Sequence, residues 1–157
     1  MSLARTFVGF SSTDINYYRL MTAWKANTNI DFNFVDCQLQ TSINSENEVY
    51  IKKLCRERIG MASKFIQLIG QDTKHKYKYV RWEAEVAMEK GCIIIGVNLN
   101  GSRKMEQDTC PPILRDIGAI FIPFSPYIIK YSIENYSMNS KGWFYYEDEI
   151  YKGLGYE

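Results

Sequence analysis

The 157-residue sequence has few of the residues that build metal or disulfide sites. It has one histidine, His75, and four cysteines, none of which forms a CxxC pair. A structural zinc site needs closely clustered ligands, so we expect no metal in this chain. Two of the cysteines lie in apolar or amphipathic segments, a pattern typical of reduced, buried thiols. The cysteines therefore predict a cytoplasmic protein.

Neither an excess of one charge nor a long apolar run is present. Nineteen basic and eighteen acidic residues leave a net charge of +1, and the basic residues form no stripe. This balance argues against nucleic-acid binding by bulk electrostatics. The apolar run at residues 6–10 is too short for the core of a signal peptide, and no later run approaches a membrane span. We therefore expect neither nucleic acid nor a membrane as a partner.

Glycine-rich phosphate loops are missing as well. Gly9 and Gly70 are isolated, and the sequence contains neither a GxGxxG nor a Walker pattern. A receiver domain would need an acidic cluster after its first strand and a phosphoacceptor after its third. The sequence "GQD" at residues 70–72 matches that requirement poorly, so we set the receiver interpretation aside.

What the sequence does contain is enough apolar material for one folded domain. Hydrophobic residues make up 46% of the chain and aromatic residues 15%, which excludes a disordered protein. The length suits one domain that buries a core without disulfides. We predict a single domain over residues 1–157, with its core at about 5–125 and an aromatic C-terminal extension at 126–157.

Alternating strand and helix patterns predict the fold. Short apolar runs that predict strands occur at residues 6–10, 30–35, 64–69, 92–97 and 119–124. Helical patterns separate them, and this alternation is typical of βαβ units with a parallel sheet. We predict a flavodoxin-like α/β sandwich of five parallel strands in the order 2-1-3-4-5, with helices on both faces. The run "CIIIGV" at 92–97 is the most apolar and should be central.

Helical spacing and capping residues place the helices between those strands. An apolar stripe with helical spacing predicts the first helix and comprises Tyr17, Leu20, Met21 and Trp24. Ser45 and Glu48 form a capping box ahead of the second helix. The buried face of the third helix is predicted to comprise Val80, Ala84, Ala87 and Met88. A last helix is expected to include Trp143, Phe144, Tyr145 and Ile150.

Ligands of such sheets bind outside the carboxyl ends of the strands, so candidate site residues must follow strands. Three segments qualify: residues 10–14, Asp36, and the start of the third helix. That helix carries Glu83 and Glu85, which point roughly 200° apart because a helix has about 3.6 residues per turn. Glu83 then flanks the buried face, and Glu85 points toward solvent.

Each of these residues also has an ordinary structural interpretation. If they have no role in a site, the glutamates are solvated residues on the helix surface and Trp82 is a packing residue. Ser11 and Asp14 are good helix caps, and Asp36 suits a turn.

Taken in order, the segments resemble the TIR-like proteins of bacterial anti-phage defence, in particular the ThsB family of the Thoeris system. "TFVGFSSTD" is similar to the first strand and loop of TIR domains, and "FNFVD" to their second strand. "SKFIQLIGQDT" and "KYVRWEAEVAMEKGCIIIGV" resemble the third strand, the glutamate-bearing helix and the fourth strand. The resemblance covers roughly residues 5–125, and residues 37–47 depart from it.

The resemblance implies an activity. Enzymatic TIR domains cleave the nicotinamide–ribose bond of NAD with a glutamate on this helix, and Glu83 matches that glutamate best, with Glu85 as its neighbour. Phe10 and Ser11 match the loop that flanks the nucleotide, and Asp36 matches the end of the second strand. Trp82 is expected to supply a wall of the substrate site by stacking. ThsB-type proteins are understood to make a cyclic ADP-ribose isomer that activates a ThsA-like effector. A phage component as the trigger, a homo-oligomer, and NAD as substrate with no cofactor are further expectations.

Two other interpretations stay open from the sequence. One is a non-catalytic TIR-like module that signals by assembly, in which Glu83 is not needed. The other is an enzyme resembling nucleoside deoxyribosyltransferases, which have a similar fold and also use a glutamate. That enzyme would exchange bases on nucleosides and be indifferent to NAD.

Overall fold

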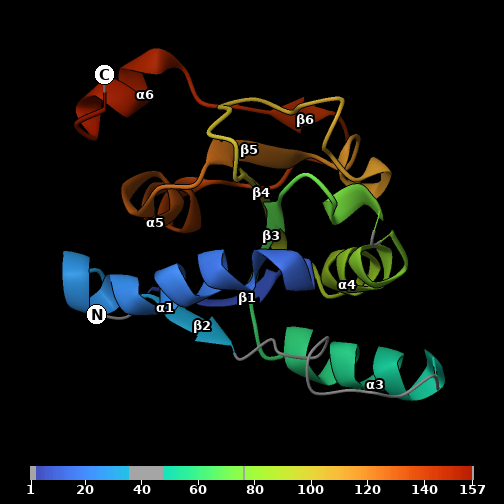
Figure 1. Ribbon diagram of the computed structural model, residues 1–157. Helices are drawn as coiled ribbons and strands as arrows, with labels where there is room; N and C mark the ends of the chain where they lie inside the picture. The colour runs from blue at the N-terminus through green and yellow to red at the C-terminus, as the bar shows by residue number, and fades with distance from the viewer. Residues whose placement is uncertain (1–2, 36–47, 76, 157) are drawn as a thin grey trace.

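Six parallel strands form one sheet in the order β2-β1-β3-β4-β5-β6 (Figure 1). The structure, a computed structural model, describes residues 3–35, 48–75 and 77–156. The strands are β1 (Arg5–Gly9), β2 (Asn33–Val35), β3 (Lys64–Ile69), β4 (Ile93–Asn98), β5 (Ala119–Pro123) and β6 (Trp143–Phe144).

Helices cover both faces of this sheet. The α-helices are α1 (Ile15–Thr28), α3 (Glu48–Ile59), α4 (Tyr77–Glu89), α5 (Pro126–Asn135) and α6 (Asp148–Gly153). Three short 3-10 helices are η1 (Ser12–Asp14), η2 (Thr73–His75) and η3 (Pro112–Leu114). Helix α1 packs beside α5, and α3 packs beside α4 (Figure 1). Within the described ranges, no helix has both the length and the apolarity needed to cross a membrane.

The predicted parallel sheet and its strand order are confirmed, with one strand added. Strands β3 and β4 lie in the middle and are buried on both faces from their second residue onward. Gly96 in β4 leaves room for the ring of Phe121 in β5, because a Cβ atom on Gly96 would lie 2.6 Å from that ring. The prediction that residues 92–97 form a central strand is therefore correct.

The C-terminal extension differs from the prediction. Residues 126–135 form helix α5, which the sequence analysis did not predict, and Trp143 and Phe144 form edge strand β6 instead of a helix. Only Ile150 of the predicted last helix is helical, in α6. Helix α5 buries Ile128, Ile129 and Ile133, a spacing that the surrounding tyrosines obscure in the sequence.

Two predicted helix faces are also partly wrong. In α1, Tyr18 and Met21 are buried, whereas Tyr17 and Leu20 are exposed. The helix is therefore rotated relative to the stripe read from the sequence. In α4, Val80, Ala84 and Ala87 are buried as predicted, but Met88 is exposed. The capping box at Ser45 falls outside the described residues, and α3 begins at Glu48.

Candidate functional site

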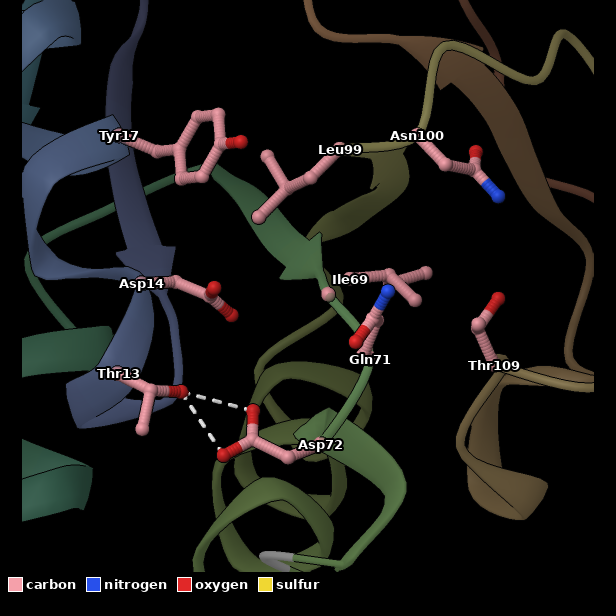
Figure 2. A pocket seen from close by; sticks show the side chains of 10 residues that line it. Thr13, Asp14, Tyr17, Ile69, Gln71, Asp72, Leu99, Asn100 and Thr109 are labelled. Atoms are coloured by element: carbon pink, nitrogen blue, oxygen red, sulfur yellow. Dashed lines mark hydrogen bonds between the residues drawn. The ribbon is translucent and has the colours of Figure 1, made fainter.

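A pocket of about 630 Å³ lies at the carboxyl ends of the central strands. Its walls come from η1 and the start of α1, from the segment after β3, and from the loop after β4 (Figure 2). The residues that line it are Thr13, Asp14, Tyr17, Ile69, Gly70, Gln71, Asp72, Leu99, Asn100 and Thr109. This is the edge of a parallel α/β sheet where ligands bind, and the volume suits a small organic molecule.

A chain of hydrogen bonds fixes one side of the pocket. The hydroxyl of Thr13 donates to both carboxylate oxygens of Asp72, at 2.8 Å each (Figure 2). Because that proton is used, the buried Ser11 hydroxyl donates to the Thr13 oxygen, 3.0 Å away. Ser11 therefore acts on the pocket through Thr13 and holds Asp72 in place.

Asp14 brings a second carboxylate into the pocket. A Cβ atom on Gly70 would lie 2.5 Å from Oδ2 of Asp14, so the glycine makes room for this carboxylate. Oδ2 is buried and has no hydrogen-bond partner among the described residues. Asp14 occupies the N-cap position of α1 without making a side-chain cap hydrogen bond, so the capping role is not its role here. Burial raises the pKa of Asp14 above 3.8, and the charge of Asp72 raises it further.

The opposite wall is formed by the loop after β4. Leu99 and Asn100 follow that strand directly, and Leu99 points across the pocket toward Tyr17 (Figure 2). The buried side chain of Asn98 stabilises the loop by donating to the carbonyl oxygens of Ser102 and Lys104, at 3.1 and 2.8 Å. Thr109 completes the wall with a buried hydroxyl that has no partner among the described residues.

The two candidate glutamates on α4 occupy opposite environments. Glu83 is 4% exposed, although a buried carboxylate is rare in proteins. Glu85 is exposed and accepts a hydrogen bond from Nε of Arg81 at 2.6 Å, an ion pair along the helix surface. The helix phase inferred from the sequence therefore agrees with the placement of both side chains.

Glu83 reaches the end of β1. A Cβ atom on Gly9 would lie 3.3 Å from Oε2 of Glu83 and 3.0 Å from Oε1 of Gln67. Gln67 in β3 is fully buried and donates from Nε2 to the carbonyl oxygens of Gly9 and Leu68. The carboxylate of Glu83 thus sits beside the amide oxygen of Gln67, near the carboxyl ends of β1 and β3. It does not belong to the walls of the pocket described above.

The remaining predicted site residues are divided. Phe10 is buried and stacks on Tyr18 with ring centroids 5.0 Å apart, so it does not line the pocket. Trp82 is half-buried and packs against the core. Asp36 lies outside the described residues. Ser11 is linked to the pocket through Thr13. That Asp36 lines the same crevice stays a prediction.

The sequence analysis did not predict several of the residues that line the pocket. Asp72 was considered only as a poor phosphoacceptor, and Asn100 and Thr109 were not considered. A usable signal was present, because Asp72 and Asn100 both come within three residues of the end of a central strand. Polar residues at those positions face the ligand edge of a parallel sheet.

A family model described as "Thoeris protein ThsB, TIR-like domain" matches residues 7–104. The chain belongs to this family. The matched segment runs from β1 into the loop after β4, so it contains Glu83 and every pocket residue except Thr109. No curated protein matches the chain. Membership makes the chain a TIR-like signalling module of the Thoeris defence type and implies a ThsA-type partner.

Proposed function

We propose that this ThsB-type domain processes NAD during anti-phage defence. It cleaves the nicotinamide–ribose bond and makes a cyclic ADP-ribose-type signal that activates a ThsA-like effector, itself an NADase. The family membership supports the defence role. The observation that carries the chemistry is the buried carboxylate of Glu83 beside Gly9, at the ligand edge of the sheet.

The proposed role of Glu83 follows from the charge that develops during bond cleavage. As nicotinamide leaves, positive charge builds on the ribose C1′ and gives an oxocarbenium-like transition state. A carboxylate held in a site with little water stabilises that charge strongly, because it needs no reorganisation at the moment of reaction. Both hydrogens of the Gln67 amide are donated to backbone carbonyl groups, so Gln67 limits the space beside the carboxylate and has no hydrogen left to donate to it.

Cyclisation rather than hydrolysis requires a substrate atom, instead of water, to attack C1′. This demands a bound conformation in which a hydroxyl or an adenine nitrogen lies close to C1′ while water is excluded. The apolar side chains Tyr17, Ile69 and Leu99 in the pocket walls suit such exclusion. The positively charged nicotinamide is a good leaving group by itself, so the proposal assigns no step to a cofactor.

A second candidate function is a non-catalytic module that signals by assembly. The observation that favours it is that Glu83 is only 4% exposed and lies outside the walls of the pocket. A catalytic Glu83 must therefore become accessible when the trigger or the substrate binds. The family match favours either TIR-like interpretation over the deoxyribosyltransferase-like one.

The experiment that separates these two functions is mass spectrometry of small molecules from cells that carry the protein. Extracts are compared with and without phage infection, and with an empty-vector control. The proposal predicts a new cyclic ADP-ribose-type product and loss of NAD after infection in cells that carry the protein. An assembly module predicts no NAD-derived product under either condition.

A further inference from the structure

The pocket at the strand ends has an unusual charge for a site that would meet a dinucleotide. Its walls include two carboxylates, Asp14 and Asp72, and no lysine, arginine or histidine among the residues that the structure describes. A pyrophosphate group would be repelled by these carboxylates. The chemistry of the walls therefore favours the other charged part of NAD, the pyridinium ring of nicotinamide.

The two carboxylates are close enough to influence each other. Burial is the larger cause of the raised pKa of Asp14, and the charge of Asp72 raises it further. Asp72 is held by Thr13, whereas Oδ2 of Asp14 has no hydrogen-bond partner in the described part of the chain. Two like charges held together in a partly buried site destabilise the free protein, and a bound cation relieves their repulsion.

The other walls suit a flat ring with a polar substituent. Tyr17 and Leu99 face each other across the pocket (Figure 2), and Ile69 adds a further apolar side chain to its walls. Gln71 and Asn100 provide amide groups, and Thr109 has a buried hydroxyl without a partner among the described residues. A nicotinamide ring has two flat apolar faces and a carboxamide that needs hydrogen-bond partners.

We propose that Asp14 and Asp72 make this pocket selective for the cationic nicotinamide ring of oxidised NAD. The reduced ring has the same outline but no positive charge, so the carboxylates would distinguish the two forms. This inference rests on the proposed function, because it names the part of NAD that the pocket holds. Asp14 and Asp72 are specificity-determining residues in this scheme, and Glu83 acts on the ribose.

The test uses two small probes that differ in charge but hardly in shape: the 1-methylnicotinamide cation and neutral nicotinamide. Each is titrated into the full chain while amide signals are followed by NMR. We expect the cation to bind about 10-fold more tightly, the change that about 1.4 kcal/mol gives. Asp14→Asn and Asp72→Asn should each remove most of this preference. Glu89→Gln, which removes an exposed carboxylate paired with Arg56 at 2.9 Å, should keep it.

The outcomes separate this inference from the proposed function. Equal binding of the two probes, no binding of either, or a preference that survives in both aspartate variants would overturn the inference, even if NAD is cleaved. A charge preference that depends on the aspartates, in a protein that never consumes NAD, would instead refute the catalytic proposal alone. Where NAD is cleaved, the loss in the aspartate variants should appear in KM rather than in kcat, as expected for a binding contact.

Discussion

Gly9 and Glu83 share one small space at the end of β1: a Cβ atom on Gly9 would lie 3.3 Å from Oε2 of the glutamate. A glycine in a strand is usually unfavourable, because it has no side chain to pack and loses more entropy on folding. Here its missing side chain lets a carboxylate and the Gln67 amide approach the backbone. The position of the Glu83 carboxylate therefore depends on the absence of a side chain at Gly9 in β1.

Gly9→Ala should impair the reaction more than it impairs folding. The added methyl group would press on Oε2 of Glu83 and on Oε1 of Gln67, 3.0 Å away, and displace the carboxylate. A small misplacement of a catalytic group can cost on the order of 10²-fold in rate. NAD turnover and melting temperature are measured together. Gly153→Ala is the control, since nothing lies within 4 Å of a Cβ atom there. Full turnover in folded Gly9→Ala would contradict the placement of Glu83.

Asp14→Asn should raise stability at neutral pH. Because the pKa of Asp14 in the folded state lies above 3.8, the native protein holds this proton more tightly than the unfolded chain does. Stability therefore falls as the pH rises through the window from 3.8 to the raised pKa, and the cost persists above it. The asparagine variant avoids this cost.

Melting temperatures of the wild type and Asp14→Asn are compared at about pH 7 and about pH 3. The variant should melt higher at the upper pH and match the wild type at the lower one, where Asp14 is protonated. A gain in stability together with a loss of the cation preference would be the trade-off expected of a binding residue. A lower melting temperature at neutral pH would show that the carboxylate is stabilising instead.

Gly96→Ala tests the packing of the central strands. The new methyl group would lie 2.6 Å from the ring of Phe121. That ring is fully buried in the core, so it has no free space to move into. Overpacking of this kind typically costs about 1–3 kcal/mol. Urea unfolding should show a lower midpoint than that of the wild type. An unchanged midpoint would contradict the packing of β4 against β5.

The sheet could be predicted from the sequence because its buried strands are short runs of mostly apolar residues. The run at 92–97 is almost wholly apolar, so its central place can be predicted without tertiary information. Helix α1 was rotated in the prediction because Tyr17 and Leu20 look like core residues, yet they remain exposed on the folded surface. Tyr17 lines the pocket, so an apolar ring at this position of the helix does not mark the face that packs on the core.

The candidate site was harder to predict for a physical reason. Asp14 and Asp72 lie 58 positions apart in sequence and meet only because Gly70 admits a carboxylate beside its backbone. No local pattern encodes such a contact. The position of Glu83 was accessible, because helix geometry alone separates it from Glu85. Its closeness to Gly9 and Gln67 depends on the register of β1 with β3, which pairs those two residues.

The catalytic account depends most directly on which glutamate the reaction needs. Glu83→Gln keeps the size of the side chain and removes its charge. Loss of a preorganised group that stabilises the transition state typically costs about 10²–10³-fold in rate. Glu85→Gln only breaks the exposed pair with Arg81, which should change stability by less than about 1 kcal/mol and leave the rate intact.

The measurement is the amount of NAD-derived cyclic product in infected cells that carry the wild type, Glu83→Gln or Glu85→Gln, with melting temperatures of the purified proteins as a check on folding. The account predicts product with the wild type and Glu85→Gln, and a loss of about 10²-fold or more with folded Glu83→Gln. If only Glu85→Gln loses product, the catalytic glutamate is Glu85 and the assignment to Glu83 is wrong. A folded Glu83→Gln that makes as much product as the wild type would contradict the central claim.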